Sequence, residues 1–114
     1  MNASKRITGL SVLVLALAAS CPVFAADQGA PQLTIKNHTF TPAELTIPAG
    51  QKVKLTVKNE DNEAAEFESF ELNREKIVPA HGEVTVFIGP LDAGTYPFFN
   101  DFDRDKTQGK IIAK

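Results

Sequence analysis

The sequence is poor in the residues that form disulfides or bind soft metals. Its 114 residues include one cysteine, Cys21, one methionine, Met1, and no tryptophan. Both sulfur-containing residues lie near the N-terminus, in a stretch that has the pattern of a cleaved leader. The folded part of the chain therefore has no thiol for a disulfide or for nucleophilic catalysis. It also lacks the thiolate and thioether ligands that select cuprous copper, so such a centre is not expected.

Residues 1–25 have the features of an export signal. Two basic residues precede an almost unbroken apolar run, Ile7 to Ala19, and the segment ends in the small-residue pattern Val23-Phe24-Ala25. The run is shorter than the roughly 20 residues of a membrane-spanning helix. We therefore expect a signal peptide that is removed and a periplasmic protein. Lipidation at Cys21 is a minor alternative, because the usual leucine is absent three positions earlier and Pro22 follows.

Removal of residues 1–25 would leave 89 residues, enough for one domain with a modest core. Two of the twelve Lys and Arg lie in the signal segment, so ten would remain against fourteen Asp and Glu, a balance of −4. This acidic balance argues against a nucleic-acid partner. We expect a flexible tail at residues 26–31 and a single domain at residues 32–114.

From Gln32 onward, the sequence consists of short alternating segments separated by Pro, Gly and Asn. Apolar residues spaced by two occur at Leu33 and Ile35, at Leu45 and Ile47, at Val53, Leu55 and Val57, at Val84, Val86 and Ile88, and at Tyr96 and Phe98, before a final pair, Ile111-Ile112. A period of two bounded by turn residues is typical of β-strands. Seven to eight such strands predict an all-β fold, a Greek-key β-sandwich or barrel. Residues 71–76 are compatible with one helical turn.

Acidic residues gather beside phenylalanines in two segments. Glu66 and Glu68 lie in EFESFEL, and Asp101 and Asp103 lie in FFNDFDRD. Because the phenylalanines should reach the core, these carboxylates should lie at a partly desolvated rim, where repulsion raises the pKa of at least one of them. A bound cation would reverse that cost, and oxygen ligands suit iron, manganese, calcium or cupric copper. The alternative is a set of surface carboxylates that pair with Arg74, Lys76, Arg104 and Lys106.

Two histidines could add nitrogen ligands. His38 follows the first predicted strand, where it could face the 100–103 loop, and His81 lies in a Pro-Ala-His-Gly turn. A lone histidine in a turn is more often a surface residue than a ligand, and His38 is the better candidate of the two. No catalytic triad is indicated, because Ser69 has no histidine at a suitable spacing.

Three segments resemble the cupredoxin-like domain in order and spacing: NHTFTPAELTIPAGQKVKLTVKN, then EFE, then GPLDAGTYPFFN. In copper-carrying cupredoxins, a histidine follows the V-x-L-x-V-x-N strand, and a cysteine ends the G-T-Y-x-F-x strand, with a histidine and a methionine after it. Glu66 and Asn100 stand at those places here, and the loop from Asp101 to Gln108 contains neither histidine nor methionine. The resemblance implies the cupredoxin fold over nearly all of residues 32–114, without a blue-copper centre.

Within this superfamily, the chain is most similar to cupredoxin-like proteins of bacterial periplasmic iron uptake, including EfeO-type and Ftr-type domains, which work beside a membrane iron permease. Their stretches are similar to EFESFELNREK and FFNDFD, with histidine where Phe70 and Asp103 stand. Loss of these imidazoles shifts the expected cofactor toward iron, Fe2+ or Fe3+, with copper as the second option. The resulting hypothesis has Glu66 and Asp101 as primary ligands, Glu68 and Asp103 as secondary ligands, and His38 as a nitrogen donor.

Three functions are compatible with this sequence. The first is a periplasmic metal-binding protein that assists ferrous iron uptake by delivering iron to a membrane permease. Whether it also oxidises Fe(II) stays open, because the chain supplies no electron acceptor other than a second metal. The second is a metal-free interaction module of the cell envelope whose acidic rim docks another protein. The third is copper electron transfer.

Overall fold

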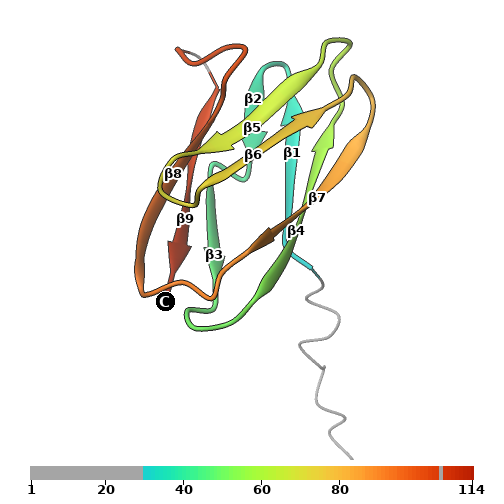
Figure 1. The fold of residues 1–114 in the computed structure, drawn as a ribbon. Coiled ribbons are helices and arrows are strands. Elements are labelled where there is room, and N and C mark those ends of the chain that lie inside the picture. The colour runs from blue at the N-terminus through green and yellow to red at the C-terminus, as the bar shows by residue number, and fades with distance from the viewer. Residues whose placement is uncertain (1–29, 106) are drawn as a thin grey trace, which may run out of the picture.

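The protein is a two-sheet β-sandwich (Figure 1). The computed structural model describes residues 30–105 and 107–114, which form nine strands and no helix. The all-β prediction is confirmed, with more strands than the seven to eight expected. No helix of the described ranges is long and apolar enough to cross a membrane. The predicted signal peptide and residues 26–29 of the predicted tail lie outside the described residues.

The first sheet has four strands in the spatial order β2-β1-β4-β7. They are β2 (Thr39–Thr41), β1 (Gln32–Lys36), β4 (Val53–Asn59) and β7 (Glu83–Ile88). β1 runs parallel to β4, and the other neighbours are antiparallel. Along β4, buried Val53, Leu55 and Val57 alternate with Lys54, Thr56 and Lys58 on the outer face, as a half-buried strand requires.

The second sheet has five strands in the order β3-β9-β8-β5-β6. They are β3 (Glu44–Ile47), β9 (Gln108–Ala113), β8 (Gly94–Asn100), β5 (Ala65–Ser69) and β6 (Arg74–Val78). β3 runs parallel to β9, and the remaining pairs are antiparallel. β6 therefore lies at one edge of this sheet, beside the strand that carries EFES.

The helical turn that the sequence suggests for residues 71–76 is wrong. The chain instead makes a tight turn at residues 70–73, in which the Asn73 N–H donates to the Phe70 carbonyl at 3.1 Å. Asn73 has a φ of 52°, a left-handed conformation that asparagine tolerates well. The reversal starts β6 at Arg74 and makes residues 65–78 a β-hairpin.

The core lies between the two sheets and includes three phenylalanine rings. Phe40 from β2 packs edge-on against Phe98 from β8, with ring centroids 4.8 Å apart, and Phe67 from β5 lies 5.2 Å from Phe98. All three side chains are almost fully buried. Such aromatic contacts add to the hydrophobic burial that holds the two sheets together.

β5 positions the candidate site, because its two faces differ in polarity. Ala65, Phe67 and Ser69 are buried on the core side, and the Ser69 hydroxyl donates to the Pro97 carbonyl at 2.7 Å. Since side chains alternate along a strand, Glu66 and Glu68 project from the opposite, outer face of the sheet. The inner side of EFES thus stabilises the fold, and its outer side carries the carboxylates.

Candidate metal centre

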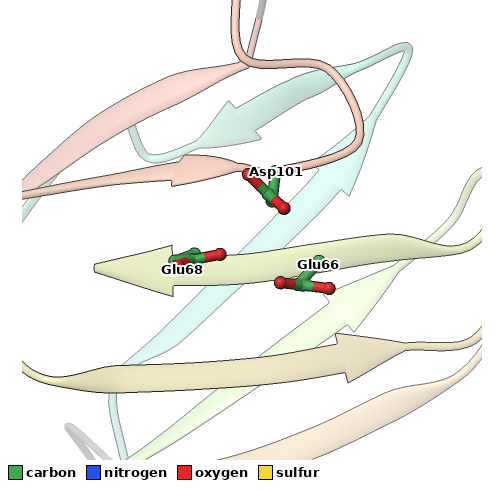
Figure 2. A group of neighbouring side chains, drawn as sticks. All are labelled: Glu66, Glu68 and Asp101. Atoms are coloured by element: carbon green, nitrogen blue, oxygen red, sulfur yellow. The ribbon is translucent and has the colours of Figure 1, made fainter. Parts of the chain in front are cut away.

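Three carboxylates from two adjacent strands meet on the outer face of the second sheet. Glu66 and Glu68 project from β5, and Asp101 directly follows β8. The Asp101 N–H donates to the Glu66 carbonyl at 2.9 Å, which holds the two segments in register. One carboxylate oxygen of each residue lies within 4.8 Å of the others, and Figure 2 shows the three side chains gathered together. We call Glu66, Glu68 and Asp101 the outer-face cluster.

Glu66 is the buried member of the outer-face cluster. It is 8% exposed, whereas Glu68 and Asp101 are half-buried. None of the ion pairs formed by the described residues includes Glu66 or Glu68. Burial raises the pKa of the Glu66 carboxyl, and a hydrogen bond with Glu68 and the negative charges of Glu75, Asp101 and Glu68 raise it further. The charged neighbours of this carboxyl group are therefore other acids, whereas a cation would be needed to stabilise its ionised form.

A fourth carboxylate borders the outer-face cluster from the edge strand. Glu75 of β6 lies opposite Glu68 in the strand register, and its charge contributes to the raised pKa of Glu66. Glu75 is not among the predicted ligands, because the sequence suggests that it lies solvated in a turn. The signal that could have placed Glu75 here is Asn73, since a turn closed by that residue pairs Glu75 with Glu68.

Among the described residues, Asp101 is the one member of the outer-face cluster that pairs with a cation. Arg104 contacts Oδ1 of Asp101 with both Nε, at 2.7 Å, and Nη2, at 2.6 Å. The guanidinium also lies over the Phe99 ring, 5.2 Å from its centroid. One of the surface ion pairs predicted from the sequence is therefore formed here, but it leaves Glu66 without a cation.

The remaining two predicted ligands, His38 and Asp103, lie together in a separate place. His38 Nδ1 is 3.6 Å from Asp103 Oδ2, and both residues line a cavity of about 70 Å³ beside Asn100. The turn after β1 thus faces the loop after β8, as expected. Asp103 is separated from Asp101 because β8 ends at Asn100 and the chain turns, with the Asp103 N–H donating to the Asn100 carbonyl at 2.9 Å.

Asp61, which also lines this cavity, holds the His38 turn in place. Its carboxylate accepts the N–H groups of Asn37, at 2.7 Å, and His38, at 2.9 Å. Burial acts to raise the pKa of Asp61, but these hydrogen bonds and the neighbouring histidines outweigh it and lower the pKa. His81 lies elsewhere, with Nε2 2.6 Å from Asn62 Oδ1. Neither histidine belongs to the outer-face cluster.

The two positions equated above with copper ligands do not form a copper site together. Asn100 is buried, and its Oδ1 accepts the backbone N–H groups of Glu66, at 2.9 Å, and Phe102, at 3.1 Å. Asn100 pairs with Phe67 on the inner face, whereas the Glu66 side chain projects from the outer face. The side chains present therefore do not fit a blue-copper centre, while three carboxylates fit a hard cation.

The strand order, with Glu66 and Asn100 at the positions of copper ligands, defines a cupredoxin-type sandwich without the usual copper ligands. The chain belongs to the cupredoxin-like domain family, whose pattern it matches over residues 9–113. It is 42% identical over 81 residues to Uncharacterized protein RP394 of Rickettsia prowazekii (strain Madrid E). The matched region covers 71% of this chain and 65% of that protein, so the chain spans less than two thirds of its relative's length.

Solved cupredoxin structures share the fold at low sequence identity. Amicyanin from Paracoccus versutus superposes with a TM-score of 0.61 at 20% identity, covering 79% of this chain and 88% of amicyanin. Auracyanin A, a blue copper protein from Chloroflexus aurantiacus, gives a TM-score of 0.63 at 17% identity, over 73% and 96% of the two chains. A purple cupredoxin from Nitrosopumilus maritimus gives 0.59 at 18% identity, over 74% and 99%. At these identities the similarity establishes the fold alone.

Proposed function

We propose that this cupredoxin-like protein binds iron at the outer-face cluster in the periplasm and delivers it to a membrane iron permease. The observation that carries the proposal is the environment of Glu66. The residue is only 8% exposed, and both its burial and its acidic neighbours raise the pKa of its carboxyl group. Ionised carboxylates are seldom buried without a cation, because desolvation and repulsion both oppose it. A metal ion would compensate both costs at once.

The ligand chemistry favours a hard metal ion. Three carboxylates supply anionic oxygen donors, and no sulfur ligand exists in the chain beyond Met1 and Cys21. Iron, manganese and calcium accept such donors, whereas cuprous copper does not. Iron is the choice supported by the resemblance of EFESFELNREK and FFNDFD to periplasmic iron-uptake domains. Cupric copper is the second option for the same site.

Delivery to a partner requires a site that can be reached and emptied. Glu68 and Asp101 are half-buried, and the site lies one strand from the sheet edge formed by β6. Three carboxylates leave further coordination positions of a hard ion to water or to a receiving ligand. Because anionic ligands stabilise Fe(III) more than Fe(II), the cluster also lowers the reduction potential of bound iron, which favours oxidation when an acceptor is supplied.

The test is a titration of the purified protein with Fe(II) under anaerobic conditions, followed by Fe(III), Cu(II) and Mn(II). We expect iron to bind with a Kd of about 1 μM or tighter. Glu66→Ala and Asp101→Ala should each weaken binding by at least about tenfold, because each removes an anionic ligand.

Glu44→Ala is the matched control for this titration. Glu44 is an exposed carboxylate of the same sheet, 3.0 Å from Lys110 Nζ and outside the outer-face cluster, so its removal should leave iron affinity unchanged. His38→Ala tests whether iron binds instead in the cavity beside Asn100, which His38 and Asp103 line. Iron binding that survives Glu66→Ala and Asp101→Ala but is lost in His38→Ala would contradict the proposed site.

A second candidate function, a metal-free interaction module, is favoured by exposed apolar residues near the outer-face cluster. Phe70 is 65% exposed in the turn after β5, and Ile77, which pairs with Glu66 in the strand register, is 56% exposed. Exposed apolar groups beside charged ones are typical of protein contact surfaces. Failure of the wild-type protein to bind iron or any other metal in the titration above would favour this function.

A further inference from the structure

Arg104 brings a positive charge to the rim of the outer-face cluster. Its Nε and Nη2 atoms both contact Asp101 Oδ1, at 2.7 and 2.6 Å. Both contacts therefore use one oxygen of the Asp101 carboxylate, and the guanidinium is not shared with Glu66 or Glu68 in the described ion pairs. A metal ion bound at the outer-face cluster and the Arg104 guanidinium would therefore both contact the Asp101 carboxylate.

Two further contacts keep Arg104 in this position. Its guanidinium lies over the Phe99 ring at 5.2 Å, and its carbonyl accepts the side-chain N–H of Gln108 at 2.7 Å. Phe99 is the strand partner of Glu68, so the ring that supports the cation is itself adjacent to the outer-face cluster. Cation–π contacts and charge-assisted hydrogen bonds both favour this placement over a freely moving side chain.

A cation at the edge of a metal site has two electrostatic effects, which solvent screens in part here because the Arg104 side chain is 60% exposed. It partly neutralises the carboxylates while no metal is present, and it repels an incoming metal cation. A purely orienting role is the alternative. However, the Asp101 backbone is already held by the bond from its N–H to the Glu66 carbonyl, so orientation of this residue does not depend on Arg104 alone.

We infer that Arg104 is an internal counter-cation that competes with the metal ion for Asp101, lowers the metal affinity of the outer-face cluster and speeds metal release. This inference rests on the proposed function, because it concerns the regulation of the same site. It explains how a site of three carboxylates can give up its ion to another protein. It also identifies Arg104 as a residue that competes with the metal ion and does not itself bind it.

The experiment compares Fe(II) affinity and the rate of iron release to a chelator in wild type, Arg104→Gln and Arg104→Lys. We expect Arg104→Gln to bind Fe(II) about tenfold more tightly and to release it correspondingly more slowly, because a nearby repulsive charge is removed. Arg104→Lys keeps the charge and should stay within about threefold of wild type.

Arg74→Gln serves as the control, since its guanidinium donates to the carbonyls of Phe87 and Asn73 and, among the described residues, forms no ion pair with a carboxylate. It should leave both measurements unchanged. If wild type binds iron and Arg104→Gln binds it equally or more weakly, the inference is overturned while the proposed function stands. If wild type binds no iron, the proposed function fails and the inference fails with it.

Discussion

Glu66 is the residue at which folding and the proposed metal binding make opposite demands. It occupies a strand whose inner side carries Phe67, a fully buried core residue, so its position is imposed by the sheet. Its own side chain is buried among carboxylates, which makes its ionised form unfavourable while no metal is present. Strained or destabilising groups of this kind are common at functional sites, where ligand binding compensates them.

The first prediction concerns the stability of the metal-free protein. The folded-state pKa of Glu66 is raised above its unfolded value, so the stability that depends on its protonation is present at low pH and is lost as pH rises through the folded pKa. Glu66→Gln cannot ionise and should therefore unfold a few degrees higher than wild type at pH 7. The difference should shrink toward zero near pH 4. Thermal unfolding followed by circular dichroism, with chelator present, measures both values.

The control for this measurement is Glu44→Gln, which removes an exposed carboxylate paired with Lys110. It should not stabilise the protein at pH 7, because exposed ion pairs contribute little and none of the repulsion at Glu66 is relieved. A Glu66→Gln variant that is less stable than wild type at pH 7 would show that the buried carboxylate is already compensated in the metal-free protein.

The strands β8 and β9 set the position of Asp101, and their pairing requires a glycine. Gly109 faces Phe98 across the two strands. A Cβ atom at position 109 would lie 2.5 Å from Phe98 Cζ and 2.8 Å from the Ala43 carbonyl oxygen. Because Phe98 is buried in the aromatic core, its ring has little room to move.

Gly109→Ala should therefore destabilise the protein by about 1–3 kcal/mol through overpacking. Gly94→Ala is the matched control in the neighbouring strand, since its added Cβ would come no closer than 3.7 Å to Tyr96; it should change stability by less than about 0.5 kcal/mol. Urea unfolding of both variants gives the values. Equal stabilities of the two variants would contradict the described packing of β8 on β9.

The alternation of apolar residues was sufficient to predict most strands, whereas Glu66 and Glu68 were expected at a partly desolvated rim and project from the outer face of the second sheet. It did not reveal β6, because Arg74 to Val78 begins with three charged residues and has no alternating apolar pattern. The sequence also suggested one cluster for Asp101 and Asp103, because both lie beside phenylalanines in FFNDFDRD. The strand ends at Asn100, however, and the turn that follows sends Asp103 toward His38.

Residues that become neighbours only across strands or through a loop could not be predicted from the sequence. Glu75 and Arg104 complete the electrostatic environment of the outer-face cluster, but one depends on the β5–β6 register and the other on the shape of the loop after β8. The segment of β6 has no alternating apolar pattern that would fix its register, and the shape of the loop does not follow from local residue patterns. The resemblance indicated the segments that are expected to bind metal, while the geometry separates the five predicted ligands into two groups.

The whole molecule combines a cupredoxin sandwich with carboxylates on the outside of one sheet. Its inner positions serve packing and backbone hydrogen bonds, as Asn100 illustrates, and the residues proposed to bind metal project away from them. Side chains on the outer face of a sandwich contribute little to the core, so a site can be placed there without altering the fold. We propose a role in periplasmic iron delivery for this arrangement.

The central claim is that iron binds between Glu66, Glu68 and Asp101. Crystals of the protein soaked anaerobically with Fe(II), measured on both sides of the iron absorption edge, test it most directly. The account predicts an anomalous difference peak that appears only above the edge, about 2.0–2.4 Å from one carboxylate oxygen of each residue. A peak beside His38 and Asp103 instead, or no peak in crystals with a free outer face, would contradict it.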